Sequence, residues 1–170
     1  MANITLILGG IRSGKSAFAE NLVLAAGKQP IYLATSEYFN EEMRSRIEKH
    51  RTRRDGRWIN LEQPLDILAE LQRYNTMDNI VLVDCLTVWL GNLMHYQRDI
   101  ENDIALFVDG LKMLDVDVVL VASEVGLSIV PDNQMARHFA DYAGTLNQAV
   151  AAIASNVYFI AAGLPLKLKG

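Results

Sequence analysis

The chain has 170 residues, a formal net charge of −4 and a single cysteine, Cys85. Its length predicts one domain, residues 1–170, whose core needs no disulfide or structural metal. The acidic balance argues against a nucleic-acid partner, and one cysteine cannot form an internal disulfide, as expected of a cytoplasmic protein. No apolar run approaches the ~18 residues of a membrane span, and no secretory signal pattern is present, so we expect no membrane span.

The first predicted elements are a buried strand, Ile4–Leu8, and a helix, Lys15–Ala26. The residues between them match the phosphate-loop pattern G-x-x-x-x-G-K-[ST], in the strand–loop–helix context that binds nucleotide. Backbone N–H groups of such a loop point at phosphate oxygens. Lys15 is then a catalytic residue that reaches the β- and γ-phosphates, and the Ser16 hydroxyl helps to hold Mg²⁺. The predicted nucleotide-binding residues here are Gly9, Gly10, Ile11, Arg12, Ser13, Gly14, Lys15 and Ser16.

A second buried strand is predicted at Ile31–Ala34, and the small hydroxyl-bearing residues Thr35 and Ser36 follow it. In a parallel sheet, ligands collect where the carboxyl ends of the strands meet. We therefore expect Ala34, Thr35 and Ser36 to contribute to the nucleotide site.

A helix is predicted next, at Asn40–Arg54, and residues 44–57 hold seven of the sixteen lysines and arginines. Met43, Ile47 and His50 have i, i+4 and i+7 spacing, which places them on one helix face. A solvated basic helix with a structural histidine is one interpretation. The other is that His50 is a catalytic nucleophile, because a neutral imidazole can attack phosphorus and the arginines would offset phosphate charge.

The remaining chain alternates further strands with helices, which predicts an α/β fold of the P-loop NTPase type. The strands are rich in Val, Ile and Leu without alternation, as is typical of a mainly parallel sheet flanked by helices on both faces. Pro64 fits a first helical turn, and Asp132 fits a helix N-cap. The predicted strands are Ile80–Val83, Val118–Val121, Val157–Ala161 and Leu164–Leu168, and the predicted helices are Pro64–Tyr74, Leu86–Tyr96, Glu101–Leu114 and Asp132–Ala154.

Two acidic residues follow predicted strands at the same edge of the sheet. Asp84 ends the third strand, where a carboxylate can hold Mg²⁺ directly or through water together with Ser16. The alternative for Asp84 is a cap for the next helix. Glu124 follows the fourth strand and is either a second acid near the metal or a turn residue; the sequence leaves both open.

The chain resembles, nearly end to end, the bifunctional adenosylcobinamide kinase / adenosylcobinamide-phosphate guanylyltransferase family of cobalamin biosynthesis. Each matching segment is modest, but their order and spacing together are specific. The segments are Gly9–Ser16, Tyr32–Ser36, Glu42-Met43 with Arg46-Ile47 and His50, Asp55–Trp58, Glu124–Gly126, Ile129–Pro131, Ala136–Phe139, Ala143-Gly144 and Asn147-Gln148.

This resemblance implies two reactions. A nucleoside triphosphate, ATP or GTP, phosphorylates the hydroxyl of the aminopropanol arm of adenosylcobinamide. GTP then transfers GMP to adenosylcobinamide phosphate through a guanylylated histidine, which matches His50. Lys49 precedes His50 where the family often has a first histidine, and Asp84 stands where it often has Glu. The resemblance further implies Mg²⁺, homotrimers, and nucleotide contacts at Arg51, Thr52, Arg53, Arg54, Glu62 and Asp84.

Three other functions fit parts of the sequence. A one-step small-molecule kinase needs Lys15 and Asp84 but leaves His50 without a role. A GTPase switch would need the guanine motif N-K-x-D, yet no asparagine here is followed by lysine. A nucleic-acid-dependent ATPase could use the arginine run on phosphates, but the chain is acidic overall.

Overall fold

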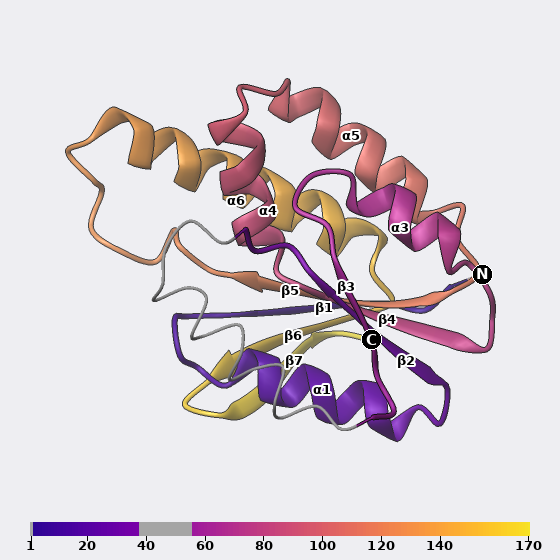
Figure 1. Ribbon diagram of the computed structural model, residues 1–170. Coiled ribbons are helices and arrows are strands. Elements are labelled where there is room, and N and C mark those ends of the chain that lie inside the picture. Colours follow the sequence, from indigo (N-terminus) through magenta and orange to yellow (C-terminus); the bar gives the residue numbers. More distant parts are fainter. Residues whose placement is uncertain (1, 38–55) are drawn as a thin grey trace.

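The computed structural model describes residues 2–37 and 56–170. All seven strands of this part of the chain join one sheet in the order β3-β2-β4-β5-β1-β6-β7 (Figure 1). Neighbouring strands from β3 to β6 run parallel, and β7 is antiparallel to β6. The strands are β1 Ile4–Gly9, β2 Gln29–Ala34, β3 Ile59–Glu62, β4 Asn79–Asp84, β5 Asp117–Ser123, β6 Asn156–Ala161 and β7 Leu164–Lys169.

Helices cover both faces of the sheet, so the predicted α/β fold is confirmed. Helix α1 lies on one face, and α3 to α6 lie on the other (Figure 1). Two apolar cores result: one beneath α1, around Ile7 and Leu82, and a larger one beneath the other helices, around Leu6 and Phe107. The helices are α1 Lys15–Ala25, α3 Ile67–Arg73, α4 Leu86–His95, α5 Ile100–Leu111 and α6 Gln134–Ile153.

Strand β3 was not predicted. It has only four residues, Ile59, Asn60 and Glu62 are exposed, and it occupies one edge of the sheet. A short edge strand of this kind lacks the apolar run that reveals a buried strand, and only its pairing with β2 defines it.

Two helix starts also differ from the prediction. Asn133, not Asp132, caps α6, because its side chain accepts a hydrogen bond from the Ala136 N–H at 3.2 Å. Pro64 precedes α3 rather than lying in its first turn, since the side chain of Gln63 accepts hydrogen bonds from the N–H groups of Leu65 and Asp66 and forms a turn there. The predicted helix Asn40–Arg54 lies entirely outside the described residues.

Candidate active site

The predicted phosphate loop joins β1 to α1, as expected. Three of its residues have positive φ: Gly9 (154°), Arg12 (56°) and Gly14 (101°). A Cβ atom on Gly9 would collide with the carbonyl oxygen of Ile160 in β6 and lie 2.7 Å from Ser13 Oγ. Glycine at position 9 is therefore required both by the backbone conformation and by the close approach of a neighbouring strand.

Lys15 is the first residue of α1 and folds back over the loop. Its side chain is buried, at 8% exposure, and its Nζ donates a hydrogen bond to the Gly10 carbonyl at 2.6 Å. Burial lowers the pKa of Lys15, while the nearby Cys85 and Asp84 act in the opposite direction. The negative charge of a triphosphate in the loop would favour the charged form of Lys15 and so counteract the effect of burial on its pKa.

The structure brings Ser16 and Asp84 together, as the sequence predicted. Ser16 Oγ, in the first turn of α1, donates a hydrogen bond to Asp84 Oδ2 at 2.9 Å, and the hydroxyl of Tyr32 in β2 donates to the same oxygen at 2.9 Å. Asp84 ends β4 before α4, but its side chain does not cap α4. The structure therefore does not support the alternative that the Asp84 carboxylate caps α4.

These residues fit a nucleotide-bound Mg²⁺. Magnesium prefers oxygen ligands and is usually held by one or two protein groups together with phosphates and water. A hydroxyl and a carboxylate beside the phosphate loop supply that set. Among residues 2–37 and 56–170, no group of three or more His, Cys, Asp or Glu side chains could hold a metal without such help.

Thr35 is the first residue after β2, and it contacts Cys85, the first residue after β4. Its side chain is fully buried, and its hydroxyl donates to the Cys85 carbonyl at 2.8 Å and accepts from the Cys85 N–H at 2.9 Å. The hydroxyl is thus engaged within the protein, while Ser36 next to it is half-buried and Ala34 is buried. The environment of Cys85 raises the pKa of its thiol to about 11, chiefly through burial and secondarily through the Asp84 charge.

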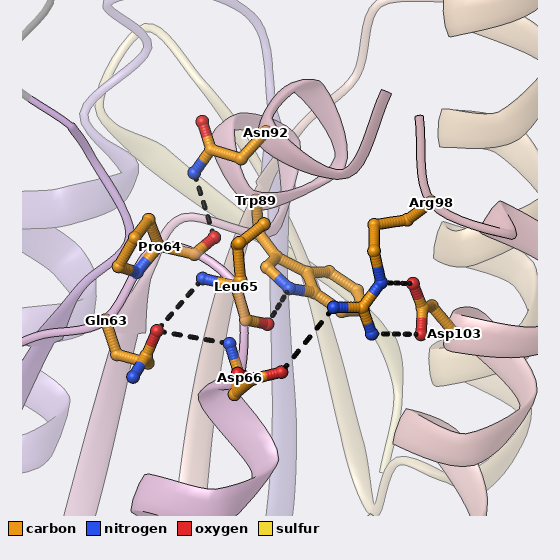
Figure 2. Close-up of polar contacts among 8 residues, drawn as sticks. All are labelled: Gln63, Pro64, Leu65, Asp66, Trp89, Asn92, Arg98 and Asp103. Atoms are coloured by element: carbon orange, nitrogen blue, oxygen red, sulfur yellow. Dashed lines mark hydrogen bonds and ion pairs between the residues drawn. The ribbon is translucent and has the colours of Figure 1, made fainter. Parts of the chain in front are cut away.

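Helix α4 holds the loop that follows β3 (Figure 2). The amide group of Asn92, 3% exposed, donates to the Pro64 carbonyl at 2.9 Å and to the Thr35 carbonyl at 2.8 Å. Trp89 Nε1 donates to the Leu65 carbonyl at 2.7 Å. Asn92 therefore links the loop that follows β2, which carries Ser36, to the loop that follows β3, which begins directly after Glu62.

An ion-pair cluster of Arg98, Asp66 and Asp103 lies next to this loop (Figure 2). Arg98 lies 3.8 Å from Asp66 and forms two hydrogen bonds with Asp103, at 2.9 and 3.0 Å. These hydrogen bonds, together with the charges of both carboxylates, raise the pKa of Arg98. The ion pairs of Arg98 are partly exposed to solvent, so we assign them a minor share of the stability of the loop.

The Glu124 side chain stabilises a turn. Its Oε1 accepts a hydrogen bond from the Gly126 N–H at 2.7 Å, and its own N–H donates to the Gly9 carbonyl at 3.0 Å. Of the two interpretations left open by the sequence, this geometry favours the turn residue.

Glu62 is a further predicted site residue that the structure describes. Glu62 ends the edge strand β3 and is exposed. His50, Arg51, Thr52, Arg53 and Arg54 lie outside the described residues. Sequence patterns alone predict no role for Tyr32, Asn92 or Trp89. The signal for Tyr32 is a phenol inside an apolar strand, since a buried tyrosine hydroxyl usually finds a polar partner.

Two solved structures share the fold of this chain. The RadB recombinase matches with a TM-score of 0.54 and 15% identity, covering 92% of this chain and 73% of that one. A second solved structure, an ATPase domain, matches with a TM-score of 0.50 and 16% identity, covering 92% of this chain and 68% of that one. At these identities the likeness concerns the fold alone. No helix in the described ranges is long and apolar enough to cross a membrane.

Sequence comparison identifies relatives over nearly the full length. The bifunctional adenosylcobalamin biosynthesis protein CobP of Pseudomonas aeruginosa is 41% identical over 167 residues, covering 97% of this chain and 96% of that protein. The proteins named CobU of Salmonella typhimurium and Escherichia coli are 35% and 36% identical, each covering 96% of this chain and 98% of their own length. The family model described as cobinamide kinase / cobinamide phosphate guanyltransferase matches residues 5–168. The chain therefore belongs to the cobinamide kinase / cobinamide phosphate guanyltransferase family.

Proposed function

We propose that this protein phosphorylates adenosylcobinamide and then converts adenosylcobinamide phosphate to adenosylcobinamide-GDP. The single observation that carries the proposal is the arrangement of Lys15, Ser16 and Asp84 around the phosphate loop, in a chain that belongs to this family. One triphosphate site can then serve both reactions, since both need the β- and γ-phosphates held.

The kinase step uses the γ-phosphate. The hydroxyl oxygen of the aminopropanol arm forms a bond to the γ-phosphorus, the bond to the β-phosphate oxygen breaks, and a nucleoside diphosphate leaves. The proton of the hydroxyl is released to water. Lys15 binds the phosphate oxygens on which charge accumulates. Ser16 and Asp84 would hold Mg²⁺, which would neutralise part of the charge on the phosphate oxygens.

The guanylyl transfer uses the α-phosphate of GTP. A nitrogen of His50 attacks the α-phosphorus and pyrophosphate leaves, which gives a phosphoramidate; the phosphate of the corrinoid then displaces the histidine. Histidine suits this role because its reference pKa of about 6.5 leaves most of the imidazole unprotonated at neutral pH. Lys49 is a poor competitor, with a reference pKa of about 10.4. Arg51, Thr52, Arg53, Arg54 and Glu62 are the proposed GTP contacts beyond the loop.

The covalent step is tested with GTP labelled at the α-phosphate, without corrinoid. Wild-type protein should take up a label that is lost in acid and survives alkali, as a phosphoramidate does. His50→Asn should take up none, yet should still phosphorylate adenosylcobinamide. His138→Asn is the matched control, since His138 is an exposed histidine on α6, and it should label normally.

Two results would contradict the assignment. Acid-labile GMP on the His50→Asn protein would exclude His50 as the nucleophile. A wild-type protein that never labels while its kinase works would favour the one-step kinase.

The assembly is part of the same proposal. Resemblance to the family implies a homotrimer with nucleotide sites near subunit boundaries, and the single cysteine fits a reducing cytoplasm. Light scattering on the purified protein should give three times the 19.0 kDa mass of one chain. A monomer at micromolar concentration would remove this part of the proposal and leave the chemistry of a single subunit.

A further inference from the structure

Tyr32 is a buried phenol that reaches the candidate magnesium site. Its side chain is 5% exposed, and its hydroxyl donates a hydrogen bond to Asp84 Oδ2 at 2.9 Å. In the β2–β4 ladder, Tyr32 lies opposite Leu82 and Ala34 lies opposite Asp84. Tyr32 and Ala34 therefore share one face of the sheet, and the small Ala34 leaves room for the Tyr32 ring to extend along the strand to the carboxylate.

The ring of Tyr32 is itself held in place. Trp58, which is 7% exposed, packs against it edge to face, with ring centroids 6.2 Å apart and an interplanar angle of 78°. Both rings belong to the apolar core beneath α1. A phenol fixed on one side by another aromatic ring presents its hydroxyl in a narrow range of positions.

The two donors to Asp84 differ in their roles when a nucleotide binds. Ser16 and Tyr32 both donate to Oδ2, and within the described part of the chain no hydrogen bond reaches Oδ1. Under the proposed function Ser16 turns its oxygen to Mg²⁺. The Tyr32 hydroxyl is not a ligand in that proposal and keeps its hydrogen bond to the carboxylate.

The geometry points to Tyr32 as a positioning residue for the magnesium–triphosphate site: its hydroxyl orients Asp84 through Oδ2 and leaves Oδ1 available for the metal or its water. The inference rests on the proposed metal role of Asp84. A hydrogen bond to an ionised carboxylate is among the stronger ones in proteins, and a carboxylate already oriented loses less freedom when it binds the ion.

The test is binding without turnover. A GTP analogue whose α–β bridge cannot be cleaved is titrated onto the protein at increasing Mg²⁺, and its affinity is also measured in EDTA. Tyr32→Phe removes one hydroxyl and keeps the ring and its contact with Trp58. We expect the half-saturating Mg²⁺ concentration to rise roughly tenfold, in line with the loss of one charge-assisted hydrogen bond. Affinity in EDTA should stay within about twofold, well below a tenfold change.

Two further variants sharpen the test. Tyr158→Phe is the matched control, because Tyr158 packs against the same core, with its ring 5.2 Å from Phe18, and makes no hydrogen bond to the site residues that the structure describes. It should leave the Mg²⁺ requirement unchanged. Trp58→Phe keeps the hydroxyl but loosens the ring, and should give a smaller shift in the same direction as Tyr32→Phe.

The outcomes separate this inference from the proposed function. A wild-type Mg²⁺ requirement in Tyr32→Phe, or an equal loss of affinity in EDTA and in Mg²⁺, would overturn the positioning role. Tyr32→Phe should add little in an Asp84→Asn background, and a full additional shift there would overturn the role as well. Asp84→Asn alone should raise the Mg²⁺ requirement; if it does not, the metal role of Asp84 in the proposed function fails, whatever Tyr32→Phe shows.

Discussion

Replacing Gly9 by alanine should destabilise the protein because of where β6 passes the phosphate loop. Gly9 ends β1 and lies opposite Ile160 in the β1–β6 ladder, with φ at +154°. The added methyl group would collide with the Ile160 carbonyl oxygen and lie 2.7 Å from Ser13 Oγ, where ordinary contacts begin at 3.4 Å. The Ile160 carbonyl cannot retreat easily, since Ile160 is fully buried and its backbone belongs to the sheet.

The expected cost follows from these two effects. A residue other than glycine in a sparsely populated backbone region costs roughly 1–3 kcal/mol, and overpacking a core costs roughly as much again. We expect Gly9→Ala to lower the free energy of unfolding by on the order of 3 kcal/mol, a large share of the 5–15 kcal/mol usual for a domain. With an m-value of about 2 kcal/mol/M, the urea midpoint should fall by about 1.5 M.

Gly10→Ala is the control for this measurement. Apart from its two chain neighbours, no described residue places a heavy atom within 4 Å of a Cβ built on Gly10, so we expect Gly10→Ala to change the unfolding free energy by less than about 0.5 kcal/mol. Circular dichroism during urea titration of both variants gives the comparison. If the two variants unfold within about 0.5 kcal/mol of each other, a typical error of such comparisons, then β6 does not lie where the structure places it.

Lys15→Ala should depress phosphorylation and guanylyl transfer together, measured with separate labelled substrates; loss of only one activity would show two nucleotide sites. Because burial lowers the pKa of Lys15, its positive charge is lost at a lower pH than that of an ordinary lysine, whose pKa is 10.5. As the pH is raised, GTP affinity should therefore begin to fall before pH 10.5 is reached. Lys28→Ala should retain that pH dependence, and Lys15→Ala should lose it. Cys85 is the only thiol of the chain and its pKa is raised from 9.0 to about 11, so its thiolate is scarce at pH 8. Alkylation by iodoacetamide at pH 8 should be about 100-fold slower in the folded protein than in urea, and equal rates would contradict the burial of this thiol.

The sequence allowed most of the sheet and the phosphate loop to be predicted because those features depend on local patterns. Buried parallel strands such as Ile4–Gly9 are continuous apolar runs, and the loop that follows has fixed glycine, lysine and serine positions. Strand β3 was missed since its four residues are mostly exposed and only the hydrogen bonds to β2 make it a strand.

The parts of the site that could not be predicted depend on contacts between distant segments. Tyr32 is 52 residues from Asp84 in sequence, and Asn92 is 57 residues from Thr35. In the sequence, Tyr32 is one more apolar residue of a buried strand, and Asn92 is one polar residue of an otherwise apolar helix. Only the pairing of β2 with β4, and the packing of α4 over their ends, gives these side chains their partners.

The loops of the site owe their shape to residues that need not touch a ligand. Thr35 uses its hydroxyl twice on the Cys85 backbone, and Asn92 uses both protons of its amide on two backbone carbonyls. Leaving one such buried carbonyl without a donor costs roughly 1–3 kcal/mol, so each loop is held near one conformation by a comparable free energy. An exposed loop held only by its own turn would sample many conformations and would lose that freedom when GTP binds. We therefore expect interior residues of α4 to affect nucleotide affinity through the loops, at a distance from the phosphates that Lys15 and Ser16 are proposed to bind.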